Sequence, residues 1–256
     1  KATTCGGGYW DIAADGSLVC LFSDETHQPA HSQLLASTRS TDGGLTFGDY
    51  REVVALPVAG ARPGMSTTAQ LPDGSWRMTY EVCAWVPNCG VRIRSSADGL
   101  DWGDPSWIGD EVKAADGSYF THTPVLAWSP YGGAGGTLVL SGQVYNAPDG
   151  TPSPGNGQTL LIDRAGGAGP WTPIDAPVHI PDPFDHYCPN YSSPVLPLDG
   201  PAILELATEW TGQECIVRYG TGVLPPPAVV PTTTSPTSTT AGPAGPPTAV
   251  VPAFTG

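Results

Sequence analysis

Apolar residues in this chain gather in short runs, and each of the four clearest runs follows a turn sequence. Runs of this length, bounded by Gly, Asp and Pro, are typical of β-strands rather than helices. The turns recur at regular intervals, which indicates four copies of one strand-rich repeat. The pairs of turn and strand are Asp15-Gly16-Ser17 with Leu18–Phe22, Asp73-Gly74-Ser75 with Trp76–Tyr80, Gly135-Gly136-Thr137 with Leu138–Leu140, and Asp199-Gly200-Pro201 with Ala202–Leu206.

A second signal is interleaved with the first. The segments Ser40–Phe47 and Ser96–Trp102 share the order Ser, Asp, Gly and aromatic, and Asp163 begins a weaker third copy. The Asp side chain can accept hydrogen bonds from nearby backbone N–H groups, glycine supplies positive φ, and the aromatic packs between sheets. We therefore predict hairpin turns after strands at 33–38 and 91–95, with structural roles for Asp42 and Asp98.

Repeats of this length, each with several short strands, predict an all-β fold of the β-propeller type. The turn pattern resembles the Asp box of the sialidase-like propellers. We expect residues 1–222 to form a propeller domain with about four blades visible. Six blades are typical of that superfamily, and the chain opens inside a repeat, so we expect about two N-terminal blades to be absent from it. A closed ring of four blades is the alternative.

The C-terminal segment 223–256 has a different composition. It holds nine Pro and eight Thr and has no charged residue. Such a segment cannot bury enough apolar surface to fold, and its prolines keep it extended. We predict a disordered linker, with a carbohydrate-binding module beyond it.

The overall composition excludes several classes of binding partner. The chain of 256 residues has 33 Gly and 29 Pro, only 13% charged residues and a net charge of −14. This negative field would repel nucleic acid and anionic membrane surfaces, and no apolar run is long enough for a membrane helix. We expect no nucleic-acid or membrane partner, no cofactor, and a monomer.

The six cysteines indicate disulfide bonds. Proximity in sequence favours Cys5 with Cys20, Cys83 with Cys89 and Cys188 with Cys215, among the 15 connectivities that six cysteines allow. Disulfides persist outside the cytosol, so a secreted, extracellular protein is expected. No metal site is predicted, because the cysteines lack paired C-x-x-C spacing and Pro29 interrupts the pair His27 and His31.

Candidate chemistry comes from carboxylates at equivalent places in neighbouring repeats. Glu25 and Glu81 both lie shortly after their Asp-Gly turns, at the ends of predicted strands, and Gln143 has the matching place in the third repeat. Equivalent strand ends converge at one mouth of a propeller, and glycoside cleavage usually requires two carboxyl groups. The alternative is that both glutamates are ordinary solvated acids.

The surrounding segments resemble those of glycoside hydrolase family 93, the exo-arabinanases. The resemblance covers roughly residues 8–210. Its segments are Leu21–Glu25, Arg62-Pro63-Gly64-Met65, Met78–Glu81, Gly132–Leu138 and Asn190–Leu196. It implies a retaining enzyme that releases arabinobiose from α-1,5-L-arabinan through a carboxylate pair in the propeller funnel. Glu25 and Glu81 would be that pair. The sequence leaves their roles open, with Glu25 preferred as nucleophile and Glu81 as acid/base, and Tyr191 would touch the sugar or a carboxylate.

Other residues are weaker candidates for the same site. Arg62 is expected to hold a substrate hydroxyl or carboxylate, or else to stabilise a turn. Trp10 and Trp85 offer faces for sugar stacking, although tryptophans in propellers are commonly core residues. Glu205 and Glu209 lie on the fourth predicted strand, and either is an alternative member of the carboxylate pair.

Three rival functions stay open at this point. The first is an exo-sialidase, which would use three arginines and a Tyr-Glu nucleophile. The second is a carbohydrate-binding propeller without catalysis, in which Glu25 and Glu81 need not lie close together. The third is an incomplete piece of a propeller that has no activity of its own.

Overall fold

The computed structural model describes residues 9–26, 28, 31–56, 58–83, 89–181 and 188–227. These residues form β-strands and turns without an α-helix, as the all-β prediction requires. None of their segments is a helix with the length and apolar character needed to span a membrane. The expected linker, Cys5 and Trp85 lie outside the described residues.

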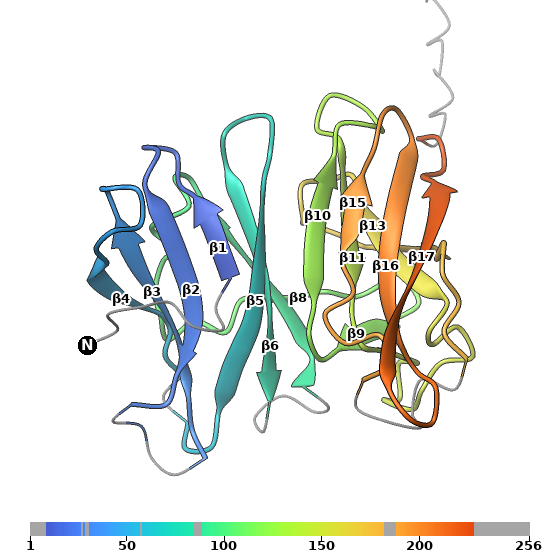
Figure 1. Cartoon of the computed structure of the whole chain (residues 1–256), viewed down its shortest axis with the longest axis horizontal. Coiled ribbons are helices and arrows are strands. Elements are labelled where there is room, and N and C mark those ends of the chain that lie inside the picture. Colours follow the sequence, from blue (N-terminus) through green and yellow to red (C-terminus); the bar gives the residue numbers. More distant parts are fainter. Residues whose placement is uncertain are drawn as a thin grey trace, which may run out of the picture.

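Four antiparallel sheets follow one another along the chain (Figure 1). Blade 1 contains β1 (Tyr9–Ile12), β2 (Leu18–Asp24), β3 (Leu34–Ser40) and β4 (Gly48–Val54). Blade 2 contains β5 (Arg62–Gln70), β6 (Trp76–Cys83), β7 (Val91–Ser96) and β8 (Asp110–Glu111). Blade 3 contains β10 (Val125–Ser129), β11 (Thr137–Ser141), β13 (Thr159–Asp163) and β14 (Thr172–Asp175). Blade 4 contains β15 (Val195–Pro197), β16 (Ala202–Trp210) and β17 (Cys215–Val223).

The sheets are arranged as successive blades in an open arc. Strands adjacent in sequence pair antiparallel within each blade, and the first strands β5, β10 and β15 contact one another in turn. Blade 1 and blade 4 lie at opposite ends of the molecule (Figure 1), so the described residues do not close a ring of four blades. A separate pair of strands joins β9 (Tyr119–Thr121), which precedes β10, to β12 (Val144–Asn146), which follows β11.

The four predicted turns each lead into the second strand of a blade: β2, β6, β11 and β16. At the first turn the Asp15 carboxylate accepts hydrogen bonds from the N–H (3.0 Å) and hydroxyl (2.6 Å) of Ser17. Gly16 between them has φ +81°, which a residue with a Cβ adopts at a cost. The local turn chemistry thus sets where each second strand begins.

The two predicted Asp boxes join the third and fourth strands of blades 1 and 2. Asp42 accepts hydrogen bonds from the hydroxyl (2.6 Å) and N–H (2.9 Å) of Thr46, and these bonds lower the pKa of Asp42 to about 2. Asp98 accepts N–H groups of Leu100 and Asp101 in the same manner. The aromatic of the second box, Trp102, is buried against blades 1 and 2.

Apolar side chains fill the spaces between the blades. Leu35 and Val54 of blade 1 pack with Met78 and Tyr80 of blade 2. Burial of one such side chain contributes roughly 1.5–3 kcal/mol to stability. Similar clusters join blade 2 to blade 3 through Ile93, Phe120, Leu140 and Trp171, and blade 3 to blade 4 through Val139, Leu160 and Ile203.

Two of the expected disulfides, Cys83–Cys89 and Cys188–Cys215, are confirmed. Cys20 is also disulfide-bonded, and its expected partner Cys5 lies outside the described residues. The last strand ends at Val223, and Leu224 is buried between blades 3 and 4. The packed body therefore extends slightly beyond residue 222.

Candidate functional site

Strained backbone positions mark one region of the molecule. Among the described residues, eight amino acids other than glycine have positive φ. Six of them surround the beginnings of the first strands β5, β10 and β15: Met65, Cys89, His122, Thr123, Asn190 and Ser192. Strained backbone of this kind concentrates at functional sites, because only a surrounding structure that requires it can maintain it. Tyr191 contacts Met65 and Ser192 bonds to Thr123, so these beginnings lie at the same end of the arc.

Glu81 projects from β6 into this region and is largely buried, with 12% of its side chain exposed. Its Oε2 accepts a hydrogen bond from the N–H of Thr123 at 2.7 Å and lies 3.8 Å from His122 Nδ1. Burial raises the pKa of Glu81, and it outweighs the Thr123 hydrogen bond and the charges of His122 and Arg62, which lower it. Glu81 is therefore held closer to its protonated form than an ordinary glutamate.

Glu25 has a different environment. It follows β2, its side chain is 65% exposed, and its Oε1 lies 3.3 Å from Nη2 of Arg62. Arg62 begins β5 and is close enough to Glu81 to lower the pKa of that carboxyl. The predicted residues Glu25, Arg62 and Glu81 are thus neighbours at one end of blades 1 and 2.

Tyr191 reaches the same region from the segment that precedes β15. Its side chain is 42% exposed, and its hydroxyl lies 3.9 Å from Met65 Sδ on β5. Burial and the negative charge of Glu81 raise the pKa of Tyr191. The next residue, Ser192, donates its N–H to Thr123 Oγ1 at 3.1 Å.

A cavity of about 390 Å³ reaches this region through Met65 and Ser192, although Glu25, Glu81 and Tyr191 do not line it. Its walls combine polar and apolar side chains from three blades, including Tyr9, Ser23, Met65, Thr67, Val125 and Ser192. Close packing of the backbone is required beside it, because a Cβ on Gly64 would lie 2.6 Å from both Ser23 Oγ and Gln33 Nε2. The cavity offers hydroxyl groups and apolar faces, the two kinds of contact that a sugar ring makes.

The remaining predicted residues have other surroundings. Gln143 bonds to the backbone beside the site: its N–H donates to His122 O (3.0 Å) and its Nε2 to Pro189 O (3.3 Å). Trp10 packs edge-on against Phe47 of the first Asp box, with ring centroids 5.0 Å apart. Glu205 is buried on blade 4, where it accepts the N–H of Val178, and Glu209 pairs with Arg218. No contact among the described residues brings Glu205 or Glu209 next to Glu81.

Two residues of the region had no sequence signal. His122 and Thr123 lie between β9 and β10, in a stretch without a recognisable motif. Thr123 acts through its backbone N–H, which every residue except proline carries, so only the three-dimensional structure reveals its role.

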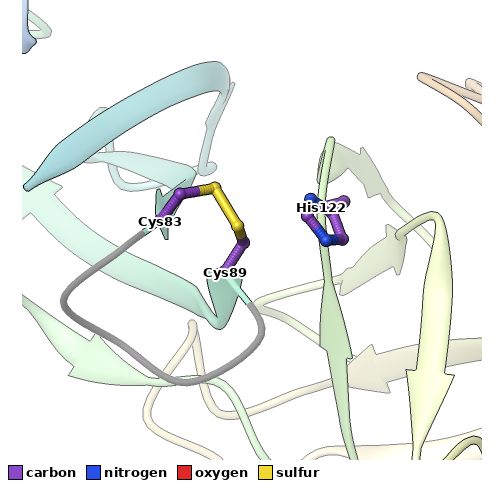
Figure 2. Close-up of side chains that lie close together, drawn as sticks. All are labelled: Cys83, Cys89 and His122. Carbon is purple, nitrogen blue, oxygen red and sulfur yellow. A yellow bond between two sulfur atoms is a disulfide. The ribbon is translucent and has the colours of Figure 1, made fainter. Parts of the chain in front are cut away.

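One group of side chains has metal-ligand chemistry. Sulfur atoms of Cys83 and Cys89 and a ring nitrogen of His122 lie within 4.8 Å of one another. Figure 2 shows the disulfide bond between the two cysteines with the His122 ring facing it. Cysteine binds a metal ion as its thiolate, and both sulfur atoms are held in the disulfide bond. In this form the cluster offers only the imidazole as a ligand.

The arginines bear on the sialidase alternative. Besides Arg62, each of the other seven is engaged elsewhere in the described structure. Four pair with acids (Arg39 with Asp15, Arg51 with Asp49, Arg92 with Glu111, Arg218 with Glu209), Arg77 and Arg164 donate to the carbonyls of Gly166 and Pro225, and Arg94 is buried between blades. The described residues therefore contain no cluster of three arginines around Glu81.

Comparison with known proteins supports the fold. No protein-family model and no curated protein matches the sequence. An α-L-arabinanase of Penicillium chrysogenum, solved with arabinobiose, is similar in structure with a TM-score of 0.66 at 24% identity, over 84% of this chain and 56% of that protein. The GH93 α-L-arabinofuranosidase of Fusarium graminearum, also solved with arabinobiose, gives 0.64 at 22% identity, over 84% and 57%.

A more distant likeness is to the NanB sialidase of Streptococcus pneumoniae, with a TM-score of 0.54 at 15% identity, over 88% of this chain and 33% of that protein. The chain thus spans little more than half the length of the arabinan-active proteins that it resembles. At these identities the likeness is one of fold. The predicted sialidase-like propeller architecture is confirmed, and this chain has the same arrangement of blades as part of those propellers.

Proposed function

We propose that this chain is a glycoside hydrolase that acts on an arabinan-type polysaccharide, with Glu81 as general acid/base and Glu25 as nucleophile. The observation that carries the proposal is the contrast between the two carboxyl groups. Glu81 is buried and its pKa is raised, whereas Glu25 is exposed and faces the Arg62 guanidinium. Two carboxyl groups in opposite environments divide the acid and nucleophile roles. Similarity in fold to arabinobiose-bound proteins supports the substrate class.

The reaction would proceed in two steps. Protonated Glu81 donates its proton to the glycosidic oxygen while a Glu25 oxygen attacks the anomeric carbon, so the C–O bond to the leaving sugar breaks and a glycosyl-enzyme ester forms. Glu81, now ionised, removes a proton from water, whose oxygen attacks the same carbon and releases Glu25. This sequence retains the anomeric configuration and requires the two carboxyl groups to lie about 5–5.5 Å apart. Tyr191 and the adjoining cavity would hold the sugar.

The test uses debranched arabinan, sialyl-lactose and xylan, with product sizes resolved by chromatography. Glu25→Gln and Glu81→Gln should each lower turnover on arabinan by a factor of about 10² to 10⁴, without a marked fall in melting temperature. Glu52→Gln on β4 is the matched control and should have full activity. An aryl arabinoside with a good leaving group needs no acid in the first step. It should therefore show a burst of aryl release with Glu81→Gln but not with Glu25→Gln.

Two of the rival functions, the sialidase and the carbohydrate-binding propeller, have their own outcomes in this assay. Sialic acid release would establish the sialidase alternative. Arabinan binding without cleavage in the unsubstituted protein would establish the carbohydrate-binding alternative. Arabinan cleavage that survives both glutamine substitutions would refute the proposed carboxylate pair. We extend the proposal to an extracellular location, in keeping with the two disulfides described above.

A further inference from the structure

The turn formed by His122 and Thr123 places two adjacent residues of the candidate site at positive φ. The two residues are consecutive and have φ +60° and +41°. A β-branched residue such as Thr is a rare occupant of this region, since its Cβ substituents crowd the backbone. The His122 N–H donates to Cys89 O (3.2 Å), and its carbonyl accepts from the Gln143 N–H (3.0 Å). These two bonds hold the turn in its unfavourable conformation.

The strained conformation aims three groups at the site. The Thr123 N–H donates to Glu81 Oε2 at 2.7 Å, and the Thr123 hydroxyl accepts the N–H of Ser192 at 3.1 Å. The His122 ring places Nδ1 3.8 Å from the same Glu81 oxygen. With negative φ at His122, its ring and the following Thr123 N–H would point elsewhere. The turn thus contacts both Glu81 and the residue next to Tyr191.

We propose that the His122–Thr123 turn is a positioning element, in which Thr123 fixes Glu81 relative to Tyr191 and His122 places an ionisable charge against Glu81. This inference rests on the proposed function only for its catalytic consequence. The Thr123 N–H occupies Oε2, so the proton of the acid form resides on Oε1. The turn therefore determines which oxygen donates as well as where the carboxyl group lies.

Four groups face Glu81 from the surrounding elements. His122 comes from the turn, Arg62 from β5, Tyr191 from the segment before β15, and the disulfide sulfur of Cys83 from β6 itself, 3.5 Å from Oε1. His122 and Arg62 are the two side chains whose positive charge lowers the pKa of Glu81. Removal of His122 takes away one of them, so the titration midpoint of Glu81 should move to higher pH. Asparagine tolerates positive φ and is the suitable replacement.

The decisive measurement does not depend on catalysis. The chain has seven glutamates, so protein labelled with ¹³C at the glutamate carboxyl carbon gives few signals. The Glu81 signal is identified by its loss in Glu81→Gln. We expect His122→Asn to raise its midpoint by about half a pH unit or more, the size of a screened interaction at this distance. His179→Asn is the matched control, because His179 pairs with Asp175 and acts on Glu205 instead. An unchanged Glu81 midpoint in His122→Asn overturns the role of His122.

Thr123 is tested by two substitutions. Thr123→Val keeps the branched shape and the N–H but leaves the Ser192 N–H without its acceptor, whereas Thr123→Ser keeps the hydroxyl. On arabinan we expect Thr123→Val to lower kcat about tenfold or more with little change in KM, the result of a displaced reacting group, and Thr123→Ser to recover most of that loss. Equal loss in both variants would show a packing role and overturn the coupling.

The two proposals can fail separately. If arabinan is not cleaved, the substrate assignment falls, while the ¹³C titration still decides the His122 inference. In that case the Thr123 coupling is read from Glu81 and from a ¹³Cζ tyrosine label on Tyr191, whose signals should both shift in Thr123→Val and not in Thr123→Ser. If arabinan is cleaved but neither variant set behaves as expected, the positioning role is refuted and the proposed function stands.

Discussion

Glu205 offers a stability prediction that is independent of catalysis. It lies on β16 with 2% of its surface exposed, and its Oε2 accepts the Val178 N–H at 2.8 Å. Its neighbours are apolar residues between blade 4 and the segment after β14, including Val178, Ile180 and Ala207. Burial raises the pKa of Glu205 to about 7, and it outweighs the Val178 hydrogen bond and the His179 charge, which lower the pKa.

The size of the effect follows from the two states of the carboxyl group. The ordinary value is 4.5, and each pH unit of difference corresponds to 1.36 kcal/mol. The folded protein holds the Glu205 proton up to about pH 7, whereas the unfolded chain releases it near pH 4.5. Between these values the folded state binds more protons, so the free energy of unfolding falls as pH rises. The total loss is roughly 3 kcal/mol and is complete above pH 7.

Glu205→Gln removes this dependence and keeps an oxygen for the Val178 N–H. We expect urea denaturation of the two proteins, with disulfides intact, to give similar free energies of unfolding at pH 4. At pH 8 the variant should be more stable than the unsubstituted chain by roughly 3 kcal/mol. Because all other titrating groups are common to both proteins, they cancel in the difference.

The difference in the free energy of unfolding between Glu205→Gln and the unsubstituted chain should rise mainly between pH 4.5 and pH 7. Glu209→Gln is the control, since Glu209 lies on the same strand but pairs with Arg218. A difference that stays flat from pH 4 to pH 8 would show that water or movement of the blades relieves the ionised carboxylate. That result would refute the view that Glu205 is held protonated by burial.

Two further changes test packing within blade 2 and the disulfide beside Glu81. Gly109→Ala should lower stability by about 2–4 kcal/mol, because Gly109 has φ +80° and a Cβ there would lie 2.7 Å from the Tyr80 hydroxyl and 2.9 Å from Ile93 O. Gly103→Ala has nearly the same φ, +79°, with no atom within 4 Å, so its smaller loss of melting temperature isolates the backbone strain, and equal losses would contradict the proposed clash. Replacement of both Cys83 and Cys89 by Ser opens a short loop and should cost about 2 kcal/mol by urea denaturation. It should also disturb the Glu81 carboxyl signal, and an unaltered signal would show that the disulfide does not support the site.

The elements that could be predicted from the sequence are those encoded by local chemistry. The Asp-Gly turns, the strands that follow them and the two Asp boxes depend on side chains that bond within a few residues of themselves, as Asp42 does with Thr46. The bonded pair Cys83 and Cys89 is likewise close in sequence. Contacts of this range leave a pattern that can be recognised in a single chain.

The orientation of Glu205 shows where such patterns are ambiguous. The alternation of β16 places Glu205 on the same face as Ile203 and Ala207, and this face is the buried one. The sequence shows that one face must be buried but not which neighbour covers it; the segment after β14 supplies the cover through Val178. Trp10, an aromatic residue of the kind that stacks on sugars, lies edge-on to Phe47 and is 41% exposed, and the sequence does not show this neighbour either.

The candidate site itself rests on two kinds of evidence, of which the sequence carries only one. Glu25, Glu81 and Tyr191 can be proposed from position and resemblance, because carboxyl and phenol groups are visible as residue types. The strained backbone cannot, since His122 and Thr123 look like ordinary strand and loop residues until their φ angles are known. Strain of this kind costs stability at every position and persists only where the fold requires it. The positive φ angles of His122 and Thr123 beside Glu81 therefore support the proposed site by an argument that does not depend on resemblance to any family.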